Sequence, residues 1–595
     1  MCGIIGVVTK KLAITDIVEG LKRLEYRGYD SSGVAILEGD KITRFREVGK
    51  LRQLQSVLDK QMLYGGCGIG HTRWATHGKP DKENAHPHCD NEQSIAVVHN
   101  GIIENYMELT KELKGRNIIL KSQTDTEVIP HLLYLELKDK KKTKMNIIRA
   151  IRSVVRKLKG SYALCIVVRG IDCVFCVKLG SPLVIGVGKQ GKYVASDSVA
   201  LKNVDSIAYL CDDDICVLES ERIVVYDKNL LKKDIDYIKV DVAQVDVVKG
   251  EYDHFMQKEI DECNNSVVST MQNLVKQDNQ KLNQILSSGE IHITACGTAL
   301  NAGKVLAHIM KVKLGINACI ECASEYRYNM LNLSKSDVGI VISQSGETAD
   351  SIGCVESMQS SGMSVIGVTN VVTSQIARMV DVNLSTIAGK ELAVASTKAY
   401  VAQVGVMYYL VNEIAKSRGI NYRLDLQKIE YIALNNNVDY YKIWNSVIDE
   451  LVDCNDLYIL GRGLDYIVAE EVALKIKEIS YIHCEAMPMG ELKHGSLALI
   501  TQKTKVIVLL TQQNLVDKVV SNIREIMARG GQVVLVTNKQ MDIEVWRRVE
   551  IMDVDDVYSV LVSVRPMQQL AYLLAIKRGN DPDKPRNLAK SVTVE

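Results

Sequence analysis

The order of hydrophobic and polar positions divides the chain into two parts of different architecture. In the first 240 residues, short apolar runs between turn residues predict β-strands. These runs are GIIGVV (3–8), SIAVVH (94–99), YALCIVVR (162–169), CVFCVKL (173–179), PLVIGVG (182–188), KYVASD (192–197) and ERIVVYD (221–227). Helical periodicity predicts amphipathic helices over 13–28 and 145–158. Strands in runs, with helices grouped apart, indicate an α+β layered sandwich.

The later part alternates strands and helices, which favours parallel α/β sheets. It also repeats itself: SVIGVTN (364–370) recurs as QVVLVTN (532–538), VISQSGETADSI (341–352) corresponds to VLLTQQNLVDKV (508–519), and IHITACGTALNAG (291–303) corresponds to LYILGRGLDYIVA (457–469). We therefore expect two copies of one unit. The expected division is 1–240, a connection with leading helices at 241–284, the copies at 285–425 and 450–585, and a tail at 586–595.

Charge and composition limit the possible partners. Lys and Arg number 73 against 72 Asp and Glu, so no basic surplus favours nucleic acid. The uncharged apolar stretch Ala399–Val411 is too short for a membrane span, and the start lacks a signal-peptide pattern. The 15 cysteines are scattered, many in apolar runs, as expected of buried thiols in a reducing compartment. We expect a cytoplasmic protein without a membrane partner.

Three N-terminal segments place polar residues in expected tight turns between apolar runs: GHTRWATHG (70–78), VVHNGIIENY (97–106) and SQTDTEVI (122–129). Arg73 can fork onto a carboxylate, and Asp125 can hold an ammonium group. Asn100 and the Gly101 N–H, expected just past a strand end, can face a developing oxyanion. The set suits an α-amino acid attacked at its far end. Alternatively, Asp125 belongs to a helix cap and Asn100-Gly101 forms a simple turn.

Cys2 stands at the start of a predicted strand. If Met1 is removed, this residue carries both a thiol and an α-amine, whose pKa of about 7.7–8.0 lets it accept the thiol proton. Nucleophile and base then reside in one residue. The alternative is a structural cysteine. HPHCD (86–90) lacks the paired ligand spacing of zinc sites, so no metal is predicted.

The C-terminal motifs indicate phosphate and proton chemistry. In SQSGETADS the hydroxyls of Ser343, Ser345 and Thr348 precede a predicted helix N-terminus, which suits a phosphate group; helix capping is the alternative. CGTALNAGK and GRG lack the spacing of nucleotide-binding loops, so no ATP or NAD cofactor is predicted. Lys475 and Glu478 share a helix face, either for acid–base work or as a surface ion pair.

MCGIIGV, LEYRGYDSSG, GHTRWATHG, HNGIIENY and TDTE, in this order, resemble the class II glutamine amidotransferases. CGTALNAG, SQSGETADS, ELAVASTKAY, KIKEISYIHCEA, ELKHGSLALI and PRNLAKSVTVE are similar to a tandem of sugar isomerase domains. Together they resemble the glutamine–fructose-6-phosphate aminotransferase (isomerizing) family, the glucosamine-6-phosphate synthases, over nearly the whole chain. The resemblance implies an N-terminal nucleophile αββα sandwich followed by two parallel-sheet sugar isomerase domains.

By this resemblance, Cys2 attacks the glutamine amide, and Asn100 and Gly101 form the oxyanion hole. The residues that would hold glutamine are Arg73, Thr76, His77 and Asp125. Trp74 would gate an internal ammonia path. The residues that would bind the sugar phosphate are Thr298, Ser343, Gln344, Ser345, Thr348, Val394 and Ser396.

The resemblance also implies roles in isomerisation. Lys590 would form a Schiff base with fructose 6-phosphate, Glu478 would move a proton between C1 and C2 with Lys475 supporting, and His494 of a neighbouring subunit would open the ring. A homodimer follows, without a cofactor. Ala299 departs from the family's usual serine. Two alternatives stay open: an amidotransferase that sends ammonia elsewhere, and a sugar-phosphate sensor without activity.

Overall fold

The computed structural model describes residues 2–592, except for 76, 203, 240–248, 330–332, 437 and the side chain of residue 26. The chain folds into two compact units. The first comprises Met1–Val247 with Ser591–Glu595, and the second comprises Val248–Lys590.

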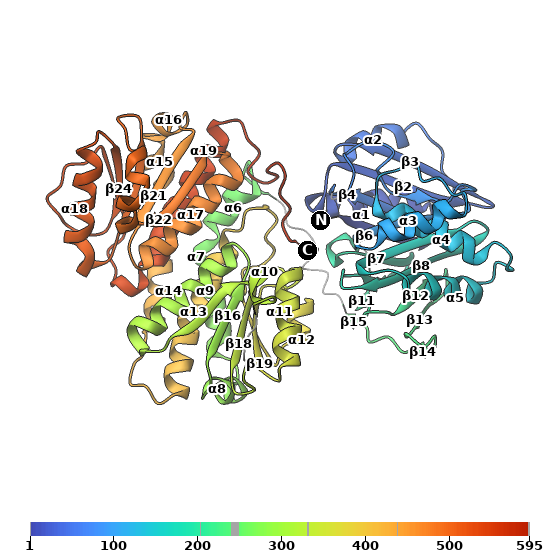
Figure 1. Ribbon diagram of the computed structural model, residues 1–595, viewed down its shortest axis with the longest axis horizontal. Coiled ribbons are helices and arrows are strands. Elements are labelled where there is room, and N and C mark those ends of the chain that lie inside the picture. Colours follow the sequence, from blue (N-terminus) through green and yellow to red (C-terminus); the bar gives the residue numbers. More distant parts are fainter. Residues whose placement is uncertain are drawn as a thin grey trace. The chain divides into compact units, whose positions relative to one another are not determined.

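The first unit contains two antiparallel sheets (Figure 1). Over the described residues, the first sheet has the order β15 (Ile238–Lys239), β11 (Ser206–Tyr209), β9 (Val184–Val187), β10 (Gly191–Ala195), β1 (Gly3–Thr9), β4 (Cys67–Arg73), β2 (Ser31–Glu38) and β3 (Lys41–Val48). The second has the order β14 (Lys232–Lys233), β13 (Ile223–Tyr226), β12 (Ile215–Leu218), β8 (Ile171–Leu179), β7 (Gly160–Val168), β6 (Ile95–Ile103) and β5 (His88–Cys89). The helices are α1 (Ala13–Leu24), α2 (Leu51–Leu58), α3 (Tyr106–Gly115), α4 (Val128–Leu137) and α5 (Lys144–Val155).

Strand β1 shows how the layers form. Ile4 and Val8 belong to the apolar cluster between the two sheets, whereas Ile5 and Val7 face the cluster built with α1 and α2. A strand points successive side chains to opposite faces, so an uninterrupted apolar run suits a strand buried on both sides. A third cluster joins the second sheet to α3, α4 and α5. The predicted αββα sandwich is confirmed.

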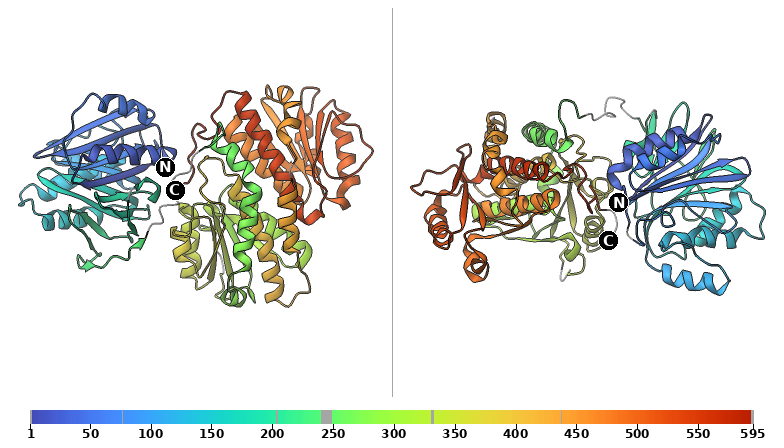
Figure 2. Two further views of the ribbon diagram at one scale, coloured as in Figure 1. Left: turned by 180° about the vertical axis from the view of Figure 1, so that it is seen from behind. Right: turned by 90° about the horizontal axis from the view of Figure 1, so that it is seen from above.

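In the described part of the second unit there are two parallel five-stranded sheets with helices on both faces, seen from two further directions in Figure 2. The first has the order β17 (Ala318–Cys322), β16 (Ile291–Ala295), β18 (Val338–Ser343), β19 (Ser364–Thr369) and β20 (Val382–Ser385). The second has the order β22 (His483–Pro488), β21 (Asp456–Gly461), β23 (Lys505–Leu510), β24 (Gln532–Thr537) and β25 (Arg547–Glu550).

Helices of the second unit precede, connect and cover these sheets. Those around the first sheet are α6 (Phe255–Asp261), α7 (Cys263–Val275), α8 (Gln280–Leu286), α9 (Thr298–Ile309), α10 (Ala323–Tyr326), α11 (Ala349–Ser360), α12 (Gln375–Met379) and α13 (Lys398–Ser417). Those that follow are α14 (Leu426–Asn435), α15 (Tyr440–Asn445), α16 (Ile448–Leu451), α17 (Leu464–Ser480), α18 (Val516–Met527) and α19 (Ser559–Lys577).

The predicted internal repeat is confirmed down to the backbone. Both sheets place their first strand second in the order, next to their third strand. Gly297 precedes α9 with φ 54° and ψ −127°, and Gly463 precedes α17 with φ 59° and ψ −128°. Only glycine adopts this backbone region without strain, so both copies start their first helix in the same way.

One described helix, Asp556–Lys577, is long and apolar enough to cross a membrane. Within its most apolar stretch, 83% of the residues are buried inside the protein, and the helix packs against α17. This is the environment of a core helix in a globular unit.

The 15 cysteines are free thiols, and most of them are buried, as their apolar contexts predicted.

Candidate functional site

The Cys2 thiol lies immediately before β1, at the N-terminal end of an interior strand of the first sheet. Its Sγ accepts a hydrogen bond from the Trp74 N–H at 3.2 Å and donates to the Trp74 carbonyl at 3.5 Å. These bonds tie the start of β1 to the residue that follows the adjacent strand β4. Burial raises the pKa of the Cys2 thiol, while the Trp74 N–H and the Arg73 charge act in the opposite direction.

Asn100 faces Cys2 from the second sheet. Its Nδ2 donates to the Cys2 carbonyl at 2.9 Å. His71 on β4 lies 3.1 Å from the Asn100 Oδ1 and 2.9 Å from the His99 carbonyl. Burial lowers the pKa of His71 to about 3, so its ring is neutral and donates one N–H between these two oxygens. His71 thereby fixes the amide so that its donor end points towards Cys2.

The turn predicted at Asn100 and Gly101 is wrong, because both residues lie inside β6, which continues to Ile103. Arg73 is the last residue of β4, and the loop predicted for GHTRWATHG begins directly after it. Gly101 has φ 126°, and a Cβ there would lie 2.1 Å from the Ser161 carbonyl oxygen. A glycine is therefore required within the strand, which a reading as a simple turn did not anticipate.

The segment after β4 forms a loop around the Arg73 side chain. The guanidinium donates to the carbonyl oxygens of His77, Gly78 and Lys79. In this structure the Arg73 guanidinium therefore binds backbone oxygens rather than a carboxylate. His77 packs edge-on against Tyr106, with ring centroids 5.3 Å apart. The predicted glutamine-binding Thr76 lies outside the described residues.

Asp125 is buried at the start of a 3-10 turn, and its Oδ2 accepts the Ile103 N–H at 2.8 Å. The alternative of a helix cap is wrong, because this carboxylate binds the end of β6 rather than N–H groups of its own helix. Asp125 thus binds the end of the strand that carries Asn100 and Gly101. Trp74 is half-buried, and its ring meets Tyr29 edge-on at 5.9 Å.

The histidines near HPHCD form a buried group. The rings of His71 and His86 stack with centroids 4.2 Å apart, and His88 meets His86 at 4.7 Å. Burial lowers the pKa of each of these rings. Over the described part of the chain, no group of three or more His, Cys, Asp or Glu side chains is placed to hold a metal ion.

In the second unit, the strand order of the first parallel sheet reverses between β16 and β18. Ligands of such sheets bind outside the carboxyl ends of the strands at this switch point. Thr298 follows β16, and the Ser343–Thr348 loop follows β18. Within that loop the Ser343 and Thr348 hydroxyls lie 2.9 Å apart, and Ser343 Oγ accepts the Gly346 N–H at 3.0 Å. Thr348 does not cap α11 with its side chain, so the capping alternative is wrong for it.

Lys475 is buried in α17 between two carboxylates of its own helix. Its Nζ lies 2.6 Å from Glu478 Oε2 and 3.7 Å from Glu471 Oε1. The surface ion pair considered above is wrong, because the Lys475 side chain is 1% exposed. Thr298 Oγ1 donates to Glu471 at 3.2 Å, which connects a predicted sugar-binding residue at the start of α9 to this group. Burial raises the pKa of Glu471 to about 7.

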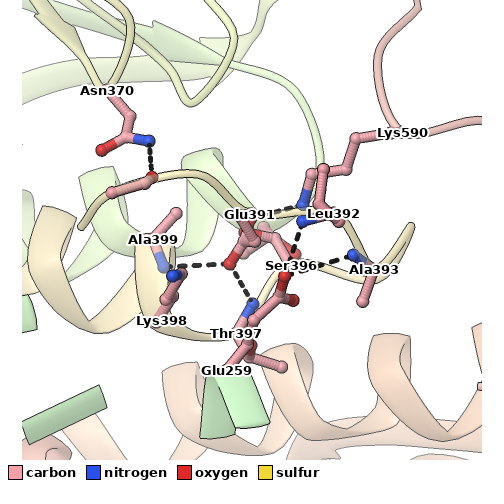
Figure 3. A network of polar contacts seen from close by, with 12 residues as sticks. Glu259, Asn370, Glu391, Leu392, Ala393, Ser396, Thr397, Lys398, Ala399 and Lys590 are labelled. Atoms are coloured by element: carbon pink, nitrogen blue, oxygen red, sulfur yellow. Dashed lines mark hydrogen bonds and ion pairs between the residues drawn. The ribbon is translucent and has the colours of Figure 1, made fainter. Parts of the chain in front are cut away.

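Lys590 forms an ion pair with Glu391 (Figure 3). Both side chains are almost completely buried. Ser396 donates to the same Glu391 oxygen at 2.8 Å, so the predicted imine lysine and a predicted sugar-binding hydroxyl meet at one carboxylate. Val394 lies beside them, and its N–H donates to the Asp583 carbonyl at 3.1 Å. Gln344 and Ser345 are half-buried in the loop after β18, whereas His494 is exposed on a 3-10 turn.

Three residues of the two candidate sites, Glu471, Glu391 and His71, were not predicted from the sequence. Glu471 precedes Lys475 by four residues, a helical spacing that could have identified it. Glu391 lies inside the motif ELAVASTKAY, but no local pattern connects it to the distant Lys590. His71 is part of GHTRWATHG, and its contact with Asn100 arises only from sheet stacking.

The sequence matches the glutamine amidotransferase domain family over residues 71–203 and the SIS domain family over 284–412 and 450–576. Fold and sites therefore define a glutamine amidotransferase domain joined to two SIS domains. Proteins named glutamine–fructose-6-phosphate aminotransferase (isomerizing) from Clostridium acetobutylicum and Clostridium tetani are 42% and 41% identical to this chain, with 100% of each chain covered. The chain belongs to this aminotransferase family.

Solved structures share the fold of the second unit. The C-terminal domain of glucosamine-fructose-6-phosphate aminotransferase from Francisella tularensis is 31% identical and has a TM-score of 0.53, covering 57% of this chain and 100% of that chain. A putative tagatose-6-phosphate ketose/aldose isomerase from Clostridium novyi shares the fold, at 16% identity and a TM-score of 0.51, covering 57% of this chain and 93% of that chain.

Proposed function

We propose that this protein converts fructose 6-phosphate and glutamine into glucosamine 6-phosphate and glutamate, the first step of amino-sugar synthesis. The observation that carries the proposal is the pairing of two reactive groups in one chain. Cys2 is ordered beside amide donors in the first unit, and Lys590 is buried among carboxylates in the second. Family membership supports the same reaction.

In the first unit, Cys2 is the nucleophile. Its Sγ attacks the amide carbon of glutamine, the carbon–nitrogen bond breaks, ammonia leaves, and water hydrolyses the resulting thioester. Asn100 Nδ2 and the Gly101 N–H stabilise the oxyanion. Arg73 and Asp125 hold the α-carboxylate and α-amine, with His77 and Thr76 supporting. Arg73 exchanges part of its loop contacts for the substrate carboxylate.

Cys2 needs its own base. Because burial raises the pKa of this thiol, little thiolate exists at neutral pH. A free α-amine on the same residue accepts the proton at the moment of attack. The active form therefore begins at Cys2, after removal of Met1.

The released ammonia passes internally to the sugar, with Trp74 as a gate.

In the second unit, the phosphate binds at the switch point. The residues proposed to contact the sugar phosphate are Thr298, Ser343, Gln344, Ser345, Thr348, Val394 and Ser396. Lys590 forms an imine with the open-chain ketose. Glu478 moves a proton between C1 and C2, and the buried Lys475 fixes its orientation through the 2.6 Å contact. His494 of a neighbouring subunit opens the ring.

We further propose a homodimer, in which each subunit supplies His494 to the other, that works in the cytoplasm without a metal or organic cofactor. Its partners are the two substrates, and neither nucleic acid nor a membrane takes part.

Incubation with glutamine and fructose 6-phosphate tests the proposal. Glucosamine 6-phosphate and glutamate are expected in equal amounts. A chain that hydrolyses glutamine without aminating the sugar would be an amidotransferase that serves another acceptor. Binding of fructose 6-phosphate with no product from glutamine or free ammonia would instead indicate a sensor.

A further inference from the structure

The strongest unassigned feature is the carboxylate of Glu391. We propose that Glu391 docks the Lys590 amine and accepts the proton that this amine gives up before it attacks the sugar ketone. The inference rests on the proposed imine at Lys590 and adds the group that prepares this amine for attack.

The two oxygens of Glu391 have separate partners (Figure 3). Oε1 accepts the backbone N–H groups of Thr397 at 2.9 Å and Ala399 at 3.0 Å, at the start of α13. Oε2 receives Lys590 Nζ and the Ser396 hydroxyl. One oxygen thus anchors the carboxylate to the fold, and the other faces the reactive amine.

Burial makes this pair sensitive to its proton. Glu391 is 6% exposed, and an isolated charge there is costly. Burial raises the pKa of Glu391, but the Lys590 charge, the hydrogen bond from that amine and the N–H groups together lower it. When Lys590 becomes neutral, the contribution of its charge disappears. A proton on Oε2 then removes an otherwise uncompensated buried charge.

Neighbouring acids are engaged elsewhere. Glu259 on α6 accepts the N–H groups of Leu392 at 2.5 Å and Ala393 at 3.3 Å. Burial and the Glu391 charge raise the pKa of Glu259 to about 8, so it is largely protonated at neutral pH.

The remaining charges near Glu391 have partners of their own. Glu262, after α6, binds Lys398 at 2.6 Å. On α17, the Glu391 charge acts on Lys475, whose contact at 2.6 Å is Glu478. Glu391 is therefore the acid placed to receive a proton from Lys590.

The substrate of this step is the open-chain ketose. The Lys590 ammonium transfers one proton from Nζ to Glu391 Oε2, and the freed nitrogen lone pair attacks C2. The C2–N bond forms, the two protons left on nitrogen depart with the carbonyl oxygen as water, and the imine remains. Hydrolysis or amine exchange at C2 releases Lys590, which recovers its proton from Glu391.

The separate roles of the two oxygens allow a selective variant. In Glu391→Gln the amide oxygen takes the place of Oε1 and keeps both backbone N–H bonds. The amide nitrogen replaces Oε2, where it opposes the ammonium and cannot accept a proton. Glu262→Gln is the matched control, because it removes a carboxylate paired with a lysine of the same unit but not with Lys590.

The test is borohydride trapping of the full-length protein with fructose 6-phosphate, with the Lys590 adduct followed by peptide mass spectrometry. Wild type and Glu262→Gln should trap at rates within about twofold. Glu391→Gln should trap about 100-fold more slowly, the size of a lost proton transfer, with a similar fall in kcat and a small change in KM. Equal trapping by Glu391→Gln and wild type would overturn the inference.

Absence of an adduct in wild type would contradict the imine at Lys590 itself, and with it this part of the proposed function. If Glu391→Gln unfolds, Glu391→Asp provides the comparison, since it retains a proton acceptor. Trapping by folded Glu391→Asp at no more than a hundredth of the wild-type rate would count against proton acceptance, whereas a rate within about tenfold of wild type would support it.

Discussion

The guanidinium carbon of Arg586 lies 4.2 Å from the centroid of the Tyr481 ring, and the Arg586 backbone N–H donates to the Tyr481 hydroxyl at 2.7 Å. Tyr481 follows α17 directly and adopts a left-handed backbone, with φ 60°. Asn580 donates to carbonyl oxygens at the same helix end. The chain that leads to Lys590 is therefore attached to the helix that carries Lys475 and Glu478.

Tyr481→Phe should weaken this attachment. It removes the hydroxyl that accepts the Arg586 N–H and keeps the ring. The lost hydrogen bond is worth about 1 kcal/mol, so we expect an about fivefold fall in kcat/KM for fructose 6-phosphate. Tyr481→Ala also removes the cation–π contact and should cost more. Steady-state kinetics measure both. Wild-type kcat/KM in both variants would show that the contact does not position the C-terminal segment.

The same segment should respond to the sugar. We expect fructose 6-phosphate to protect it from limited proteolysis, because Lys590 then gains a covalent partner. Digestion with and without ligand, followed by mass spectrometry, measures this protection. Equal cleavage rates would contradict ligand-linked ordering.

Lys475→Met should destabilise the second unit by about 3–5 kcal/mol. The substitution removes the ammonium that compensates the carboxylate charges of Glu471 and Glu478. Denaturant unfolding measures the loss. Combining it with Glu471→Gln should recover part of the stability, because one buried acid is then neutral. Additive effects of the two substitutions would argue against coupling.

Removal of Met1 should control the glutaminase half. Intact-mass measurement of active protein should show Cys2 at the N-terminus. Cys2→Ala should lose glutamine-dependent synthesis and keep slow synthesis with free ammonia, because the isomerase residues are untouched. Normal use of glutamine by this variant, or by protein that retains Met1, would contradict the N-terminal nucleophile.

Acid should affect the two units with opposite sign. The pKa of His71 falls from 6.5 to about 3 on folding, so the unfolded chain binds more protons between these values, and stability falls as the pH drops. The loss from His71 alone is about 2 kcal/mol at pH 5. The pKa of Glu471 rises from 4.5 to about 7, so its contribution is full below 4.5 and declines towards pH 7.

Hydrogen exchange at pH 7.5 and pH 5, corrected for intrinsic rates, measures this difference in each unit. Protection of β4 and β6 should fall at pH 5, while α17 should keep or gain protection. Unchanged protection of β4 at pH 5 would contradict the neutral buried histidine.

Ala299→Ser should strengthen phosphate binding. Ala299 lies in the first turn of α9, which follows β16 beside the switch point. One added hydrogen bond of about 0.5–1.5 kcal/mol lowers KM for fructose 6-phosphate by about 2- to 10-fold, with kcat retained. A KM equal to that of the wild type would mean that this hydroxyl does not reach the phosphate.

Local sequence pattern predicted most of the architecture. Alternation and buried runs predicted β1, β6, β7 and β8, and the repeat predicted two parallel sheets. The pattern failed where strands carry polar residues. Asn100 and Gly101 were assigned to a turn, because polar groups and glycine are typical of loops. They lie in a strand because contacts with the neighbouring chain segments stabilise them there.

By itself, the sequence determined the order of the elements, the duplication of the α/β unit and the identity of the reactive groups, because these follow from local periodicity and motif spacing. Only the tertiary structure decided which groups meet. Glu391 holds Lys590 across a separation of 199 residues, and Lys475 is buried rather than exposed. Such contacts depend on how distant helices and strands pack, and no local pattern encodes that packing.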